Sequence, residues 1–166
     1  MPASDQGISR ERYMLVPRVL IFLRRGGSVL LIKGAPTKRL WANMYNGVGG
    51  HVEPGEDLLS AARRELLEET GLSAGLRLCG TVAVETGQSP GVGIFVFTGE
   101  YLQGELKASV EGTLEWVPFA DIPGLPAVED LVILIGKIRG MQPGDPPFSA
   151  RSHYDPQGKL VLEFGE

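Results

Sequence analysis

The chain of 166 residues is long enough for one domain with a substantial hydrophobic core. Its formal net charge of -4 argues against a broad electrostatic surface for a nucleic acid polymer or an anionic membrane. A single cysteine, Cys79, excludes an internal disulfide, and there is neither a signal-peptide pattern nor an apolar run of the roughly 18 residues that a membrane span needs, so a cytoplasmic protein is expected.

The chain begins with a polar stretch and continues with a predicted β-hairpin. Residues 1–12 are expected to be a loose segment before a single domain over residues 13–166. Two apolar runs, Val16–Arg25 and Ser28–Lys33, are separated by Gly26-Gly27. Apolar runs on either side of a glycine pair are typical of antiparallel strands joined by a tight turn.

Three cations lie in or beside the loop predicted at residues 34–44. They are Lys33, Lys38 and Arg39. Either this is an ordinary solvated loop, or it forms a rim that faces phosphate groups. The next segment, Tyr45–His51, has three glycines in four positions, which lets the backbone approach a ligand closely.

A helix is predicted after the turn signal Pro54-Gly55. It should begin near Glu56 or Asp57, with Asp57 as the N-cap, and Gly71 suits the left-handed position just past its end. Three apolar residues share one helical face and are expected to pack on a sheet; they are Leu59, Ala62 and Leu66.

Three glutamates share a second face of this helix. Glu65, Glu68 and Glu69 stand at positions i, i+3 and i+4, so they are neighbours on the helix surface. Like charges at that spacing destabilise an isolated helix. A hard divalent cation would explain the arrangement, because Mg²⁺ and Mn²⁺ favour carboxylate, carbonyl and water oxygens.

The second half of the chain is predicted to hold strands, one more helix and a terminal hairpin. The strand-like runs are residues 76–86, 93–101 and 113–117. Residues 126–141 contain a helix candidate, although the short apolar run Leu131–Ile135 could also be a strand. The tail is expected to form a hairpin closed at Asp155–Gly158. Together the elements predict an α/β domain with a mixed sheet and two principal helices.

The glycine-rich segment and the glutamate helix together resemble the signature of the Nudix hydrolases. That signature is a Gly, five residues, a Glu, seven residues, and then Arg-Glu-apolar-x-Glu-Glu-x-Gly-apolar. The matching residues are Gly50, Glu56, Arg64, Glu65, Leu66, Glu68, Glu69, Gly71 and Leu72. The resemblance implies the Nudix fold, an α/β/α sandwich around a mixed β-sheet.

The same resemblance implies hydrolysis of a nucleoside diphosphate linked to a further group, with Mg²⁺ or Mn²⁺ as the cofactor. The implied metal ligands are the carbonyl of Gly49 and the side chains of Glu65, Glu68, Glu69 and, from a later loop, Glu111. Arg64 and Glu56 are implied to hold a carboxylate in place. The general base is expected to be Glu68 or Glu65, with Glu111 as a competitor.

Substrate preference is expected to depend on residues around this signature. The stretch from Asn46 to Gly50 resembles the branch of MutT type, the 8-oxo-dGTP diphosphatases. Asn46 then reads a base, because an amide both donates and accepts hydrogen bonds, or is only a turn residue. Glu129 and Asp130 either read the base or complement the dipole of the second helix.

Three functions follow as hypotheses. The first is a (d)NTP pyrophosphohydrolase, with oxidised purines as one preference, and it makes Lys33 and Arg39 candidate phosphate contacts. The second applies the same chemistry to ADP-ribose, a dinucleotide polyphosphate or a nucleotide sugar. The third is a non-catalytic nucleotide-binding domain. The expected partner is a small-molecule nucleotide, and a homodimer is one expectation from the family.

Overall fold

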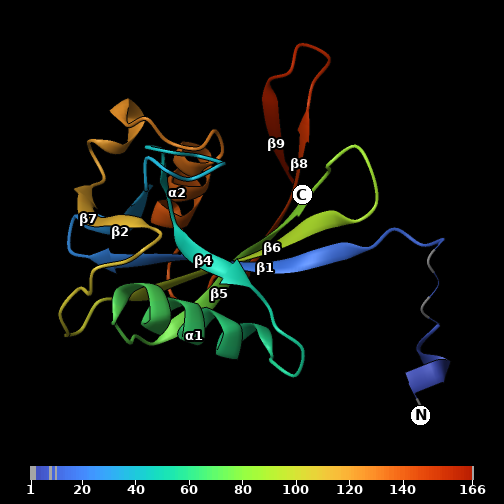
Figure 1. The fold of residues 1–166 in the computed structure, drawn as a ribbon, viewed down its shortest axis with the longest axis horizontal. Helices are drawn as coiled ribbons and strands as arrows, with labels where there is room; N and C mark the ends of the chain where they lie inside the picture. Colours follow the sequence, from blue (N-terminus) through green and yellow to red (C-terminus); the bar gives the residue numbers. More distant parts are fainter. Residues whose placement is uncertain (1–2, 8, 10, 166) are drawn as a thin grey trace.

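The computed structural model describes residues 3–7, 9 and 11–165. The described part of the predicted loose segment contains one short 3-10 helix, η1 (Ala3–Gln6), and it stands away from the body of the molecule (Figure 1). Residues 1, 2, 8 and 10 of that prediction lie outside the described residues.

Within the described residues, nine strands form one mixed sheet in the order β3-β2-β1-β6-β5-β8-β9, with β4 paired to β1 and β7 paired to β2. The strands are β1 (Leu15–Arg25), β2 (Ser28–Gly34), β3 (Tyr45–Asn46), β4 (Val48–His51), β5 (Leu76–Val84), β6 (Gly91–Glu100), β7 (Gly112–Pro118), β8 (Phe148–Tyr154) and β9 (Leu160–Phe164). Two pairs, β1 with β6 and β5 with β8, are parallel, and the others are antiparallel. The predicted mixed sheet is confirmed.

The predicted first hairpin is present, but its two strands diverge. β1 and β2 pair only next to the turn, at Arg24↔Val29 and Arg25↔Ser28. Farther along, the segment from Arg18 to Ile21 pairs with β4, while β2 pairs with β7 along its whole length. This divergence admits the glycine-rich strand β4 beside β1 and brings it to the edge of a cleft.

Two helices cover opposite faces of the sheet (Figure 1). One is α1 (Leu58–Thr70), which packs Ala61, Ala62 and Leu66 into one core with side chains from β1. The other is α2 (Leu131–Gly140), which packs into a second core with Phe22. The α/β/α sandwich is therefore confirmed, and the ambiguous apolar run is a helix. Neither these helices nor any other described helix is long and apolar enough to cross a membrane.

Both ends of α1 follow the sequence prediction. The Asp57 carboxylate accepts hydrogen bonds from the backbone N–H groups of Leu59, at 2.9 Å, and Ser60, at 3.0 Å. Gly71 ends the helix with a φ of 76°, and its N–H donates to the carbonyl of Leu67. The local sequence thus fixes where α1 begins and ends, and with that the direction in which its glutamates point.

The tail forms the predicted hairpin of β8 and β9, which rises from the body of the molecule (Figure 1). The turn between the strands is closed by a hydrogen bond from the Gly158 N–H to the Asp155 carbonyl. At the base of the hairpin, Phe148 is buried and its ring meets that of Phe164 edge-on, with centroids 5.4 Å apart. The hairpin is therefore anchored to the core and forms one wall of the cleft described next.

Candidate active site

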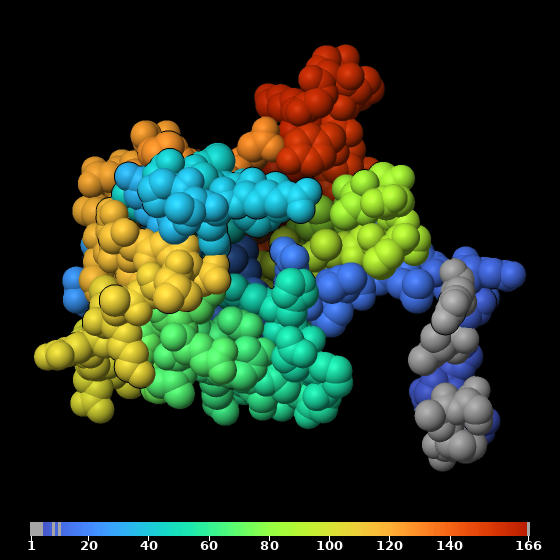
Figure 2. Space-filling view, viewed as in Figure 1, coloured from blue at the N-terminus to red at the C-terminus, as the bar shows by residue number. Residues whose placement is uncertain are grey.

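A cleft of about 1060 Å³ extends from the glutamate face of α1 to the start of α2 and the terminal hairpin. Figure 2 shows the surface hollowed between the light-blue loop around residue 40 and the green segments of β4 and α1. The floor is apolar and comes from neighbouring strands of the sheet. Its residues include Leu20, Val84, Val92 and Ile94. A mainly apolar cleft with a few polar side chains at its edges is typical of small-molecule sites.

Arg64 is the centre of the ion-pair network on α1. Its guanidinium donates two hydrogen bonds to Glu56, at 2.6 and 2.9 Å. It also donates to Glu65 at 2.8 Å and to Glu68 at 3.3 Å, and to the backbone carbonyl of His51 at 3.0 Å. The hydrogen bonds from Arg64 to Glu56 lower the pKa of the Glu56 carboxyl to about 2. Arg64 therefore ties α1 to β4 and orients two of the glutamates, as the resemblance implied.

The paired glycines of β4 let the backbone meet the glutamates directly. The N–H of Gly49 donates to the Glu69 carboxylate at 3.3 Å. A Cβ at Gly50 would lie 2.4 Å from a carboxylate oxygen of Glu65, closer than real atoms approach. Burial, followed by the charges of Glu65 and Glu111, raises the pKa of the Glu69 carboxyl to about 7. The sequence places glycine here because a side chain would displace Glu65.

The donor types in this corner suit a hard divalent cation. Glu65, Glu69 and Glu111 all line the cleft. Burial and the charges of the other two carboxylates make ionisation of Glu69 less favourable, a cost that a bound cation would offset. As the side chains stand, no group of three or more acidic, His or Cys side chains among the described residues converges on one point. Glu65 and Glu68 turn to the guanidinium, and Glu111 pairs with Lys38. Glu68 is 61% exposed and lies beside the cleft, outside its lining.

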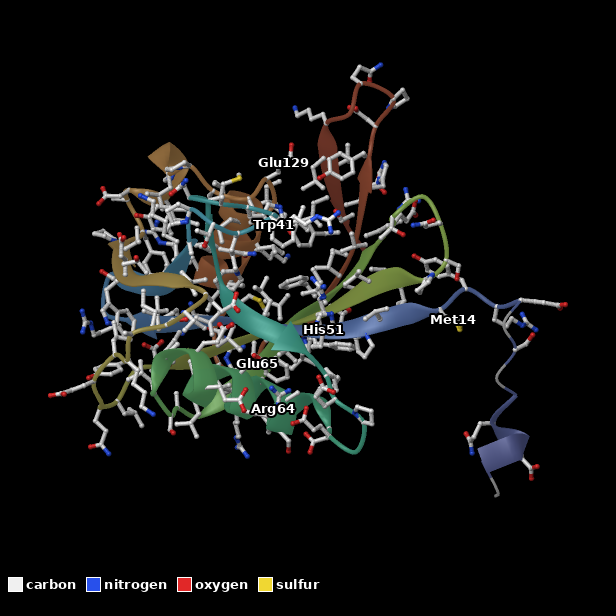
Figure 3. The ribbon with its side chains drawn as sticks, viewed as in Figure 1. Met14, Trp41, His51, Arg64, Glu65 and Glu129 are labelled. Carbon is white, nitrogen blue, oxygen red and sulfur yellow. The ribbon has the colours of Figure 1, made fainter. Side chains whose placement is uncertain are left out.

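The opposite wall carries the residues predicted to read a base. Figure 3 shows Trp41 and Glu129 across the cleft from Glu65. Asn46 lines the cleft, and its Oδ1 accepts a hydrogen bond from the Gly47 N–H at 2.7 Å. That local contact is typical of a turn residue, but it leaves the amide NH₂ group available as a donor. Both interpretations of Asn46 are thus compatible with its position.

Glu129 and Asp130 also line this wall, at the start of α2. The Asp130 side chain makes no capping hydrogen bond, and burial raises the pKa of its carboxyl. Glu129 instead accepts a hydrogen bond from the Tyr154 hydroxyl, at 2.9 Å. Asp130 thus lines the cleft, and its two predicted roles, base recognition and dipole complementation, stay predictions.

The three cations predicted in or beside the loop at residues 34–44 differ in their positions relative to the cleft. Of the three, only Lys38 lines the cleft, where it pairs with Glu111. The ammonium of Lys33 lies 5.5 Å from the centre of the Tyr45 ring, and Arg39 is exposed outside the lining. The prediction that Lys33 and Arg39 contact phosphate stays a prediction, and their positions add no support to it.

The structure also brings in residues that the sequence interpretation did not assign to the site. Arg18, His51, His153 and Tyr154 line the cleft. The side chain of His153 is half-buried, and its Nδ1 is buried without a hydrogen-bond partner among the described residues. For Arg18 a signal was present, because it is the one charged residue in the apolar run from Leu15 to Leu23 of β1.

Comparison with known proteins agrees with this architecture. The sequence profile of the NUDIX domain matches residues 14–134, and the chain belongs to the Nudix hydrolase family, whose members generally require a divalent metal ion. An oxidized purine nucleoside triphosphate hydrolase of Danio rerio is 35% identical over 63% of this chain and 67% of its own length. The protein of the same name from Mus musculus is 34% identical over 62% and 69%. The MutT protein of Bacillus halodurans shares the fold, with a TM-score of 0.76 at 24% identity over 90% of this chain and 97% of its own.

Proposed function

We propose that this protein is a Mg²⁺- or Mn²⁺-dependent pyrophosphohydrolase of purine nucleoside triphosphates, with oxidised purines as preferred substrates. One observation carries the proposal: a single cleft joins the glutamate face of α1 to a wall of hydrogen-bonding side chains. The two relatives named oxidized purine nucleoside triphosphate hydrolases support the choice of substrate.

The glutamates and the backbone of β4 would hold the cation. The proposed ligands are the Gly49 carbonyl and the carboxylates of Glu65, Glu68, Glu69 and Glu111. The bound cation neutralises the phosphate chain and stabilises charge on its oxygens. Glu56 acts indirectly, because it fixes the guanidinium of Arg64 through two hydrogen bonds.

Proton transfer is assigned to a carboxylate on α1. A carboxylate oxygen of Glu68 or Glu65 takes the proton from the attacking water, and the water oxygen bonds to phosphorus. The bridging P–O bond breaks, and the products are a nucleoside monophosphate and pyrophosphate. Glu68 suits this role because its side chain is largely exposed and its contact with Arg64 is the longest of the network, so it can turn toward the cleft.

Base recognition is assigned to the opposite wall. The Asn46 amide offers a hydrogen-bond donor, and Glu129 and Asp130 offer acceptors. The apolar floor between them can cover the face of a purine, and the half-exposed Trp41 stands at the cleft. Oxidation at the purine C8 position changes which edge atoms donate and which accept, and paired polar groups can discriminate such a change strongly.

A hydrolysis screen with identified products tests the proposal. The substrates are dGTP, 8-oxo-dGTP, ATP, 2-oxo-dATP, ADP-ribose and a dinucleotide polyphosphate, each with Mg²⁺ and with excess chelator. We expect chelator-sensitive release of pyrophosphate and a monophosphate, with the highest kcat/KM on an oxidised purine. Preferential cleavage of ADP-ribose to AMP and ribose phosphate would instead support the second hypothesis, and absence of hydrolysis of every substrate would contradict a catalytic role.

A further inference from the structure

Arg18 is a cation in the cleft that has no acidic partner among the described residues. It lies on β1, where its side chain shares the floor with Leu20, and it is half-buried. No described carboxylate lies within ion-pair distance of its guanidinium, although the other cleft cation, Lys38, is paired with Glu111. Burying a charge is costly unless it is paired or hydrogen-bonded, and that cost is larger inside a cleft that a ligand would close off from water. An arginine without a partner in a substrate cleft therefore suits an anionic group of the ligand.

His51 holds this arginine in position. The two residues face each other in the pairing of β1 with β4, and Arg18 Nε donates a hydrogen bond to His51 Nε2 at 3.1 Å. Because Nε2 accepts, the ring carries its proton on Nδ1, which is a second donor. The two terminal nitrogens of the guanidinium have no hydrogen-bond acceptor among the described residues. The pair thus presents several unused N–H donors, the pattern that binds phosphate oxygens.

The pair is joined to the catalytic corner. His51 directly follows Gly50, whose backbone lies against the Glu65 carboxylate, and the His51 carbonyl accepts a hydrogen bond from Arg64. One residue along a strand is about 3.3 Å, so the pair lies within reach of a phosphate chain that passes over the paired glycines. Figure 3 shows His51 between Glu65 and the wall that carries Trp41.

We propose that Arg18 and His51 form a phosphate-binding subsite, in which Arg18 contacts the substrate and His51 positions its guanidinium. This inference rests on the proposed function for the identity of the substrate. It gives the cleft a second cation besides Lys38 to balance the charge of the phosphates. It also explains why a charged residue interrupts the apolar pattern of β1.

The test measures binding of separate parts of the substrate to wild type, Arg18→Ala and Arg18→Lys. Titration calorimetry with Mg²⁺ present uses pyrophosphate, dGMP and deoxyguanosine as ligands. We expect Arg18→Ala to weaken binding of pyrophosphate, of dGMP or of both by roughly tenfold or more, and to change deoxyguanosine binding by less than about twofold. Arg18→Lys should recover part of the loss, because it restores the charge without the planar fork.

Three controls keep the result specific. Arg63→Ala removes an exposed arginine of α1 outside the cleft and should leave all three affinities unchanged. His51→Gln keeps an acceptor for Arg18 Nε and should weaken phosphate binding less than His51→Ala. Melting temperatures and circular dichroism spectra of all variants establish that they are folded.

Two results would overturn the subsite. One is unchanged binding of both phosphate ligands in folded Arg18→Ala. The other is an equal loss for deoxyguanosine, which would place Arg18 against the base or sugar. Because these are binding measurements, they remain informative if the substrate screen shows no hydrolysis, so failure of the proposed function and failure of the subsite are separate outcomes.

Discussion

A single side chain, Arg64, organises the carboxylates of this site. It bonds to three glutamates and one backbone carbonyl, so residues separated by up to 17 positions in the sequence are held in one network. The glutamates of the site differ in how firmly their side chains are held. Glu56 is held by two hydrogen bonds, Glu69 is half-buried in the cleft lining, and Glu68 is exposed with one long contact.

The exposed position of Glu68 makes its substitution a clean test of catalysis. Glu68→Gln removes the carboxylate but keeps the size of the side chain. We expect kcat to fall by roughly two orders of magnitude or more, while the free energy of unfolding changes by less than about 1 kcal/mol, because exposed ion pairs contribute little. Steady-state kinetics and thermal melts measure both quantities. Unchanged turnover would remove Glu68 from the site.

Substitution of Asn46 tests whether this residue reads the base or only forms a turn. Asn46→Ala deletes the amide donor together with its local hydrogen bond to Gly47. If the amide reads the base, the ratio of kcat/KM between oxidised and ordinary dGTP should fall by about tenfold, with a smaller change for other triphosphates. The measurement is a comparison of kcat/KM across bases, and an equal loss on every base would leave Asn46 as a turn residue only.

At the scale of elements, strand β4 and helix α1 function as one unit. The Gly49 N–H contacts Glu69, and the Gly50 backbone leaves space that Glu65 fills. The helix is in turn held at its start by Asp57. A substitution at Gly50 or at Asp57 should therefore change the arrangement of the glutamates while leaving the glutamate residues themselves in place.

Gly50→Ala tests the close approach of strand and helix. The new methyl group would meet the end of the flexible Glu65 side chain, so the fold should tolerate it while the carboxylate moves aside. We expect at least a tenfold loss of Mg²⁺-dependent activity with a melting temperature within a few degrees of wild type. Gly75→Ala is the matched control, because a Cβ there would meet no atom within 4 Å. Full activity in Gly50→Ala would contradict the account.

Asp57 makes the stability of α1 depend on pH. Hydrogen bonds from the Ser60 hydroxyl and the helix N–H groups lower the pKa of the Asp57 carboxyl below its ordinary 3.8. The ionised form is thus favoured by the folded state, so its stabilisation is present above about pH 4 and is lost as pH falls through the lowered pKa. Asp57→Ala should lower the melting temperature at pH 7 by roughly 2–4 °C.

The difference in melting temperature between wild type and Asp57→Ala should become smaller as the pH is lowered. Thermal melts of wild type and Asp57→Ala at pH 7 and near pH 2 should converge at the lower pH. Asp57→Asn keeps a capping oxygen that does not titrate, so its melting temperature should exceed that of Asp57→Ala at both values. An Asp57→Ala difference that is the same at pH 7 and pH 2 would show that ionisation of Asp57 contributes nothing to the cap.

At the scale of the whole molecule, the parts that follow local rules were predictable. The cap at Asp57, the glycine at the end of α1 and the spacing of the glutamates are all short-range patterns, and the structure confirms the helix that they define. The terminal hairpin was likewise predicted from its turn residues. The homodimer expected from the family stays a prediction, as does the single domain over residues 13–166.

The residues that the sequence did not assign depend on long-range register. Arg18 meets His51 only because β1 pairs with β4, across 33 positions of sequence, and no local pattern sets that pairing. Which loop cation reaches the cleft depends on a loop in which Trp41 and Asn43 both have positive φ angles. Asparagine adopts such angles more often than most residues, but the residue type of Trp41 does not predict one. Sequence patterns therefore indicated the chemistry, and tertiary pairing determines the shape of the substrate cleft.

The most direct test of the central claim is a Mg²⁺ titration of pyrophosphate release from a purine nucleoside triphosphate, for wild type and for folded Glu69→Gln. Glu69 lines the cleft and accepts a hydrogen bond from the Gly49 backbone N–H. The account predicts release that requires Mg²⁺ in the wild type, and release in the variant that is reduced by at least tenfold and saturates at higher Mg²⁺. Hydrolysis that is independent of Mg²⁺, or that is identical in the two proteins, would contradict the assignment of the α1 glutamates as the metal-binding face.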